Sequence, residues 1–312
     1  MTTQFRRISI AVPLYNEEQG IAELLRRVRA VLAQLPGGPH ELVLVDDGSS
    51  DRTFELNAAA AAQESNVVAI SLSRNFGHQS ALSAALDHVT GDLVIVMDGD
   101  LQDSPDVISE FLRKYEQGFD VVYAQRVVRK EGWPLRLCYF LFYRLLLLFS
   151  SVKLPLDAGD FALLSRRVVD ELRHCPEHQR YLRGLRAWVG FRQIGISVER
   201  SERFSGESKY TLYKLFSLAL DGIFAFSIVP LRMATILGLA TTFMASLFAA
   251  YSLYVKMFLN QSPEGFTALI VTIIFVSGVQ LLFLGIIGEY LGRVYEETKG
   301  RPHYIIDRIV GR

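Results

Sequence analysis

Two carboxylates and an amide stand close together in the segment Asp98-Gly99-Asp100-Leu101-Gln102, directly after the apolar run 93–97. Their side-chain oxygens are hard ligands, which suit Mg²⁺ or Mn²⁺ shared with the phosphates of a substrate. Acidic residues of this kind also occur in ordinary surface turns. Because Asp98 and Asp100 follow a strand of the buried type, a metal site is favoured over a simple turn.

Two further polar segments also follow apolar, β-rich runs. Asp46 and Asp47 end one such run, and a carboxylate pair can hold the edge of a nucleobase or a ribose. Tyr15 and Glu17 follow another, where the ring can stack on a base and the carboxylate can accept hydrogen bonds from ribose hydroxyls. Taken alone, each segment can equally be a capped turn.

Strand-like and helix-like segments alternate through residues 1–205. Strands are predicted at 8–12, 42–45, 67–71, 93–97 and 121–124, and helices at 17–34, 51–63, 79–88 and 105–117. This alternation predicts an open, mostly parallel α/β sheet, in which ligands bind at the carboxyl ends of the strands. All three polar segments lie at such ends. The sequence contains no G-x-G-x-x-G or P-loop lysine motif, which disfavours the usual dinucleotide-binding and NTPase folds.

Two apolar segments without a charged residue, 233–255 and 266–288, each exceed the ~20 residues that span a bilayer core. Only a helix satisfies its own backbone there, so the sequence predicts a transmembrane hairpin over 230–292. Basic residues flank it on one side, namely Arg232, Arg293, Lys299, Arg301, Arg308 and Arg312. The positive-inside rule therefore predicts a multi-pass protein of the cytoplasmic membrane, with both termini and the tail 293–312 in the cytoplasm.

Two other apolar stretches contain charges. The segment 133–153 is interrupted by Arg144, and a central Arg costs about 2.5–3.5 kcal/mol on membrane insertion. We expect this segment and 206–229 to be interfacial amphipathic helices that lie flat on the membrane. The alternative is that both are ordinary core helices.

The overall composition excludes several classes of protein. Basic and acidic residues number 33 each, so the formal net charge is zero and no basic field indicates nucleic acid binding. The two cysteines, Cys138 and Cys175, cannot form a disulfide framework and suit a reducing compartment. Half of the residues are hydrophobic and 21% are charged, which fits a globular domain with a small membrane part.

The ordered motifs of the chain resemble those of a known family. The motifs are PLYNEE, VDDGSSDRT, RNFGHQSAL, MDGDLQDSP, DAGDFALLSRR, RGLRAWVGF and RFSGESKY, followed by the hairpin. Together they resemble family 2 glycosyltransferases with the GT-A fold, of the polyprenyl-phosphate type. That type includes dolichyl-phosphate mannose synthases and bacterial undecaprenyl-phosphate glucosyl- and aminoarabinosyl-transferases.

The resemblance implies roles for matching residues. The nucleotide-sugar pocket would comprise Pro13, Tyr15, Glu17, Val45, Asp47, Asp98, Gly99 and Asp100. Asp100 and Gln102 would bind the metal, Mg²⁺ or Mn²⁺. The basic residues around the leaving diphosphate and the acceptor phosphate would be Arg126, Arg203 and Lys209. Cations are needed there because two polyanions must meet at one centre.

Asp157 completes the expected catalytic set, formed with Asp100 and the three basic residues, as a candidate base near the acceptor. A phosphate monoester with a second pKa of about 6 scarcely needs deprotonation. Orienting the sugar, organising arginines or holding a loop are therefore alternative roles for Asp157. Arg74 can touch the diphosphate. His78 and His88 have no carboxylate or cysteine at metal-binding spacing in the sequence, and we expect ordinary helix residues.

The expected activity is inverting transfer of a sugar from a nucleotide diphosphate, with UDP-glucose or another UDP-sugar favoured, to a polyprenyl phosphate. Transfer of mannose from GDP-mannose is the first alternative, and a non-catalytic sugar-lipid translocation partner is a weaker one. A processive polysaccharide synthase is disfavoured, because the Q-x-x-R-W motif is missing. Relatives suggest a homo-oligomer, with a tetramer suspected.

Overall fold

The computed structural model describes residues 6–126, 158–177, 180–198, 229–259 and 265–311. These residues divide into two compact units. The first contains the sheet and the C-terminal residues 301–312, and the second contains the long apolar helices. The segments predicted as interfacial helices, 133–153 and 206–229, lie outside the described residues except for Val229.

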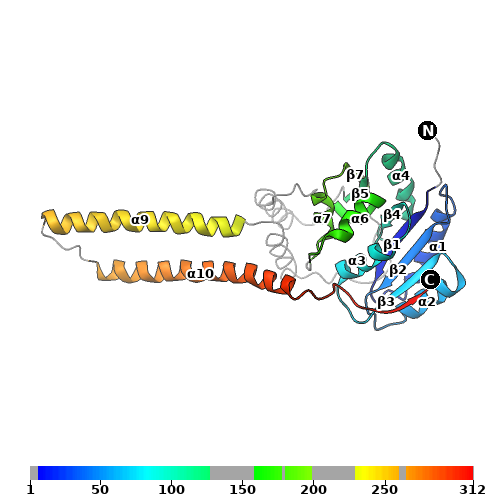
Figure 1. The fold of residues 1–312 in the computed structure, drawn as a ribbon, viewed down its shortest axis with the longest axis horizontal. Coiled ribbons are helices and arrows are strands. Elements are labelled where there is room, and N and C mark those ends of the chain that lie inside the picture. Colours follow the sequence, from blue (N-terminus) through cyan, green and yellow to red (C-terminus); the bar gives the residue numbers. More distant parts are fainter. Residues whose placement is uncertain (1–5, 127–157, 178–179, 199–228, 260–264, 312) are drawn as a thin grey trace. The chain divides into compact units, whose positions relative to one another are not determined.

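A single mixed sheet is the centre of the first unit (Figure 1). Its strands are β1 (Ile8–Leu14), β2 (Glu41–Asp46), β3 (Val67–Leu72), β4 (Leu93–Val96), β5 (Val121–Arg126), β6 (Ala158–Ser165), β7 (Gln193–Val198) and β8 (Ile306–Val310). Their order is β7-β5-β6-β4-β1-β2-β3-β8. Strands β4, β1, β2 and β3 pair in parallel, whereas β6 pairs antiparallel with β4 and β5. The predicted α/β class with a mostly parallel sheet is confirmed.

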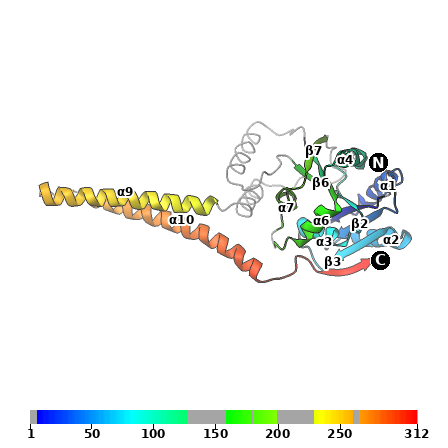
Figure 2. The same ribbon diagram turned by 45° about the horizontal axis from the view of Figure 1, so that its top comes forward.

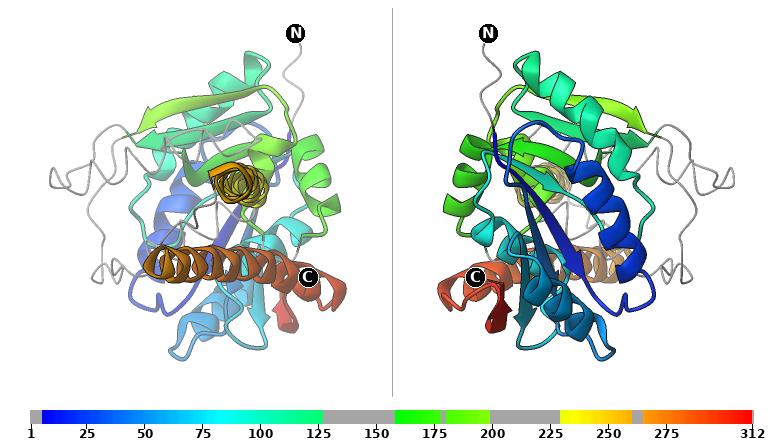
Figure 3. Two further views of the ribbon diagram at one scale, coloured as in Figure 1. Left: turned by 90° about the vertical axis from the view of Figure 1, so that its left-hand side faces the viewer. Right: turned by 90° about the vertical axis from the view of Figure 1, so that its right-hand side faces the viewer.

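Helices cover both faces of this sheet (Figure 3). They are α1 (Ile21–Leu32), α2 (Thr53–Gln63), α3 (His78–His88), the 3₁₀ turn η1 (Pro105–Val107), α4 (Ile108–Glu116), α6 (Arg166–His174) and α7 (Leu182–Trp188). Buried side chains of α1, α2 and α4 pack with one face, and those of α3, α6 and α7 pack with the other. This arrangement follows from parallel pairing, since each crossover must pass over a face of the sheet.

The hydrophobic pattern of the sequence determines which faces of these helices and strands are buried. In α1, Leu24 and Val28 repeat at helical spacing and are fully buried. In β1, successive side chains point to opposite faces, so Ile10 joins the cluster beneath α1 while Ala11 joins the cluster beneath α3. Burying a side chain such as leucine contributes about 1.5–3 kcal/mol. Strands of this parallel core are therefore apolar on both faces, as their sequences predict.

The C-terminal residues add a strand that the sequence did not predict. Strand β8 pairs antiparallel with β3 and forms that edge of the sheet (Figure 2). The N–H of Ser73 donates to the carbonyl of Ile305 (2.9 Å), and the hydroxyl of Tyr304 donates to Asp87 Oδ2 (2.8 Å). Part of the predicted tail 293–312 is thus a component of the sheet, because an unpaired edge of β3 offers backbone partners to any nearby extended segment.

The second unit contains two long helices, α9 (Val229–Leu259) and α10 (Phe266–Thr298). Both are long and apolar enough to cross a membrane, and their large side chains are mostly exposed. Leu239 and Ile274, for example, are 68% and 66% exposed. Exposed apolar surface of this extent is typical of lipid-facing helices and indicates association with a membrane.

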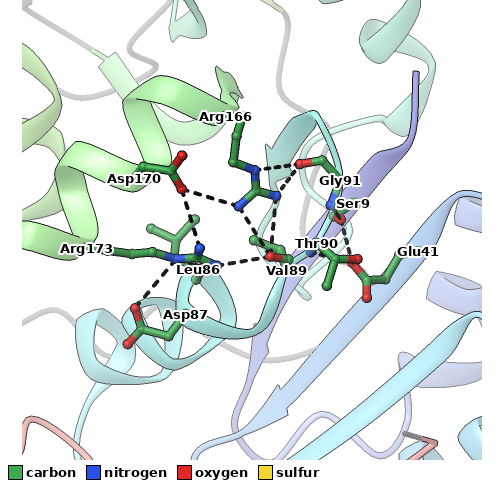
Figure 4. A network of polar contacts seen from close by, with 10 residues as sticks. All are labelled: Ser9, Glu41, Leu86, Asp87, Val89, Thr90, Gly91, Arg166, Asp170 and Arg173. Atoms are coloured by element: carbon green, nitrogen blue, oxygen red, sulfur yellow. Dashed lines mark hydrogen bonds and ion pairs between the residues drawn. The ribbon is translucent and has the colours of Figure 1, made fainter. Parts of the chain in front are cut away.

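A buried polar network lies at the amino-terminal ends of the central strands (Figure 4). Oε2 of Glu41 accepts hydrogen bonds from the Ser9 hydroxyl (2.6 Å), the Thr90 N–H (2.9 Å) and the Thr90 hydroxyl (3.0 Å). Nearby, Arg166 and Arg173 donate to backbone carbonyls at the end of α3 and in the turn that follows, including that of Val89. Cations at a helix C-terminus also interact favourably with the helix dipole.

We predict that Glu41→Ala lowers the free energy of unfolding by about 2–4 kcal/mol, because buried donors left without an acceptor cost about 1–3 kcal/mol each. Glu55→Ala is the control, since that side chain is 72% exposed. A surface change of this kind is expected to shift stability by less than about 0.5 kcal/mol. Denaturant unfolding of the detergent-solubilised protein, followed by circular dichroism, measures both. Equal stability of the two variants would contradict the role given to Glu41.

Candidate active site

Three loops rich in polar residues meet at one edge of the sheet. Strand β1 lies between β4 and β2, and its register pairs Ala11 with Val96 and Leu14 with Asp46. All three strands are parallel, so the loops that follow them leave the sheet at the same edge. The structure therefore brings together the three segments that the sequence singled out.

The loops after β1 and β2 are joined by hydrogen bonds. Asn16, which has a φ of 54°, receives a hydrogen bond at Oδ1 from the Ser50 N–H (2.9 Å) and donates its own N–H to the Ser49 hydroxyl (2.9 Å). The Glu17 N–H donates to the Thr53 hydroxyl (2.9 Å). The small polar residues of both motifs thus hold the two loops against each other.

The residues expected to line a nucleotide pocket differ in accessibility. Tyr15 is 47% exposed, so its ring is accessible to a ligand. Glu17 is half-buried beside it. By contrast, Pro13 and Val45 are buried in the sheet, and they pair with each other in the β1–β2 register. Their side chains are therefore not exposed at the surface of this region.

Asp47 has a clear structural partner. Its Oδ1 accepts from the Phe76 N–H (2.8 Å) and its Oδ2 from the Gly77 N–H (2.9 Å), which fixes the loop before α3. Gly48 has a φ of +65°, and a Cβ there would lie 2.4 Å from the Arg74 carbonyl carbon. Burial raises the pKa of Asp47, while the two backbone hydrogen bonds oppose that rise. Asp47 and Gly48 therefore position the RNFGH loop.

The segment after β4 forms a tight turn. Leu101 has a φ of 59°, and Asp100 Oδ1 accepts from the Gln102 N–H (3.1 Å). A Cβ at Gly99 would lie 2.3 Å from a methyl carbon of the buried Leu14, so any larger residue there would force the Leu14 side chain to shift. Asp98, Asp100 and Gln102 are all partly exposed. Two carboxylates and an amide oxygen in one turn are a donor set that fits a hard divalent cation.

His78 differs from its sequence expectation. It stands at the start of α3, and its Nε2 lies 3.6 Å from Asp98 Oδ1 and 3.7 Å from Asp160 Oδ2. The ligand atoms of these three residues all lie within 4.8 Å of one another. The sequence interpretation of an ordinary helix residue was wrong because spacing along the chain does not reveal partners on β4 and β6. The only local feature that hinted at a special position was Gly77, which precedes His78 in the loop between β3 and α3.

Two arginines of α7, Arg183 and Arg186, contact Asp160 and its neighbour Gly159. Arg183 donates to both oxygens of Asp160, from Nε (2.7 Å) and Nη2 (2.6 Å). Arg186 is almost fully buried, with its guanidinium 4.9 Å from the centre of the Tyr123 ring, and burial lowers its pKa to about 10. Neither arginine is among the site residues expected from the sequence.

Burial and charge set the ionisation of this cluster. Burial and the neighbouring charge of Asp160 raise the pKa of Asp98 to about 6. Burial alone would raise the pKa of Asp160, but the hydrogen bonds from Arg183 and the nearby His78 hold it well below its usual range. Desolvation would lower the pKa of His78, whose side chain is 44% exposed, yet the neighbouring carboxylates Asp160 and Asp98 raise it.

Several expected site residues are not placed by the structure. Asp157, Arg203 and Lys209 lie outside the described residues. Arg126 is the last residue of β5, and only its backbone is described. Arg74 is exposed, and its guanidinium lies 4.0 Å from the centre of the Phe76 ring. The roles of these five residues, like those of the other expected site residues, stay predictions.

We predict that Asp47→Asn destabilises the fold by about 1–3 kcal/mol, because an amide group cannot accept from both backbone N–H groups. Nucleotide binding is expected to weaken as well, since the RNFGH loop loses its anchor. The matched control is Asp106→Asn, an exposed residue at η1 that receives a hydrogen bond from the Ser104 hydroxyl. Thermal unfolding and nucleotide titration measure the two effects. Wild-type values for Asp47→Asn would show that the anchor is dispensable.

Comparison with known proteins agrees with this geometry. The family model described as glycosyl transferase family 2 matches residues 9–173. An uncharacterized glycosyltransferase of Synechocystis is 40% identical, over 97% of this chain and 96% of its own. The bactoprenol glucosyl transferase of Shigella phage SfX is 39% identical, over 96% and 98% respectively. A prophage bactoprenol glucosyl transferase homolog of Escherichia coli is 38% identical, over 97% and 99%. The chain belongs to glycosyl transferase family 2.

Proposed function

We propose that this protein transfers a sugar, with glucose from UDP-glucose as the first candidate, to a polyprenyl phosphate at the cytoplasmic face of a membrane. One observation carries the proposal: the polar loops after β4, β1 and β2 meet at one edge of a family 2 sheet. Relatives named bactoprenol glucosyl transferases match this chain over nearly its whole length, including the apolar helices.

The donor would bind along these three loops. Tyr15 offers an exposed ring for the base, and Glu17 offers a carboxylate for the ribose. Asp100 and Gln102 would hold a divalent cation, Mg²⁺ or Mn²⁺, which when bound offsets the charge of the donor diphosphate. Asp98, two residues earlier, would lie beside the sugar or the ribose.

The transfer itself would be a direct displacement. An oxygen of the acceptor phosphate attacks the anomeric carbon of the sugar. The bond between that carbon and the diphosphate oxygen breaks, and the configuration at the carbon inverts. Arg126, Arg203 and Lys209 would offset the negative charge of the leaving diphosphate and the acceptor phosphate. The acceptor is already largely dianionic at neutral pH, so Asp157 would orient the acceptor side more than remove a proton. Positioning then supplies much of the rate enhancement.

A donor screen tests the activity. Purified protein in detergent is given undecaprenyl phosphate, Mg²⁺ or Mn²⁺, and radiolabelled UDP-sugars or GDP-mannose, and label in the organic phase is counted. We expect metal-dependent transfer from UDP-glucose that falls about 100-fold or more in Asp100→Ala, because the charge stabilisation of the leaving group is lost. Asp106→Ala, an exposed acidic residue nearby, is the control.

Transfer from GDP-mannose alone would change the donor but keep the reaction class. Absence of transfer from every donor, in protein that still binds a nucleotide, would contradict the proposal. Transfer that is equally fast without divalent cations would contradict the metal role of Asp100 and Gln102.

We propose that α9 and α10 form a transmembrane hairpin over 230–292, with both termini and the domain 1–205 in the cytoplasm. The support is the length and apolar surface of the helices and the positive charges at one end of the hairpin. In this arrangement the segments 133–153 and 206–229 would lie at the membrane surface, where the acceptor phosphate is found.

Cysteine labelling tests this orientation. In a variant without Cys138 and Cys175, Ser262→Cys is expected to react with a membrane-impermeant maleimide in intact spheroplasts, because it lies in the short outer loop. Arg301→Cys is expected to react only after the membrane is opened. The reverse pattern would overturn the orientation, and labelling of both in intact spheroplasts would overturn the hairpin.

A further inference from the structure

His78 joins three elements that are far apart in the sequence. The side chain starts at the first residue of α3 and lies between Asp98, which follows β4, and Asp160 in β6. Its own position is fixed, because Asp47 holds the N–H of the preceding Gly77. The imidazole is therefore placed by the same loop that the donor-side motifs support.

The strand register explains why a hydrogen-bond donor is needed between Asp98 and Asp160. Strands β4 and β6 are antiparallel, and their last pair joins Val96 to Ala162. Extended two residues beyond Val96 and two residues back from Ala162, the same register would set Asp98 opposite Asp160. Like charges directly opposite each other on neighbouring strands are destabilising. A donor between the two carboxylates removes that repulsion.

The position of Asp160 is fixed by burial and by Arg183. The residue is 7% exposed, and both of its oxygens accept from Arg183 at 2.7 and 2.6 Å. Arg186 lies behind it and donates to the carbonyl of Gly159 (3.4 Å). A buried carboxylate held by a bidentate guanidinium does not move without a large energetic cost.

The same contacts argue against a metal ion between His78, Asp98 and Asp160. A divalent cation there would compete with Arg183 for the Asp160 oxygens and would lie beside the charges of two arginines. The Nε2 of His78 lies within 3.6 Å of Asp98 and 3.7 Å of Asp160, where an N–H can face both carboxylates without that conflict.

We propose that His78 is a positioning residue that bridges Asp98 to the Asp160–Arg183 pair and so fixes the donor side of the site relative to the acceptor side. This inference rests on the proposed function, because Asp98 belongs to the donor loop and Asp160 follows Asp157 by three residues. Without the bridge, both sides still fold and bind, but the anomeric carbon and the attacking phosphate are aligned less often.

The first test separates turnover from binding. We expect His78→Ala to lower kcat about 10- to 100-fold, as small misplacements in an active site do. The KM for donor, the affinity for nucleotide and Mn²⁺ binding should stay as in wild type. His78→Gln should recover part of the loss, because its amide can donate to one carboxylate. His88→Ala, at the other end of the same helix, is the control and should keep wild-type kcat.

Several results would overturn the bridge. A wild-type kcat in His78→Ala would overturn it. So would a loss of activity that is explained entirely by a higher dissociation constant for the nucleotide. Loss of Mn²⁺ binding in His78→Ala, equal to that in Asp100→Ala, would make His78 a metal ligand instead.

A second readout does not depend on activity. In protein labelled with ¹⁵N-histidine, the His78 imidazole signals are identified by their absence in His78→Gln. They should shift in Asp160→Asn, or in Asp98→Asn if the first variant does not fold, whereas the His88 signals should stay in place. Unshifted His78 signals would overturn the bridge. A wild-type protein without transferase activity but with these shifts would overturn the proposed function and leave the bridge intact.

Discussion

Mutual repulsion among carboxylates is the constraint on which the site depends. The parallel register of β4, β1 and β2 and the antiparallel neighbour β6 bring acidic residues to one edge of the sheet. The structure offsets their charge in three different ways. Backbone N–H groups hold Asp47, the imidazole lies between Asp98 and Asp160, and a guanidinium holds Asp160 from behind. Asp100 is partly exposed and accepts a hydrogen bond from the Gln102 N–H within its own turn. Under the proposed function, its carboxylate would help to hold a divalent cation.

These compensating groups also divide the acidic residues by task. Asp47 and Asp160 are buried and already bonded to the protein, so they shape loops. Asp98 and Asp100 are partly exposed, beside Leu101 with its φ of 59°. Under the proposed function, these two carboxylates would face the ligand. The chemical type of a residue does not distinguish these tasks, whereas its burial does.

The central part of the fold follows from local sequence, and the remainder does not. Apolar β-rich runs end at the three polar motifs, so β1, β2, β4 and the edge at which they meet could be predicted. Strand β8 could not, because Ile306–Val310 is short, carries charges and gains its partners only from the edge of β3. His78 was missed for a related reason: its two carboxylates depend on the register of β4 and β6, which no local pattern specifies. Arg183 was missed in the same way, since its partner is 23 residues away in the chain.

Strand β8 also changes how the membrane helices are connected to the catalytic unit. The helices α9 and α10 lie in sequence between β7 and β8, and both of these strands belong to one sheet. The chain therefore leaves the sheet, passes through the apolar helices and returns to it. Under the proposed function, these two covalent connections would restrict the separation of the domain from a membrane-bound acceptor more than one connection does, and a shorter separation gives a higher effective concentration of the acceptor.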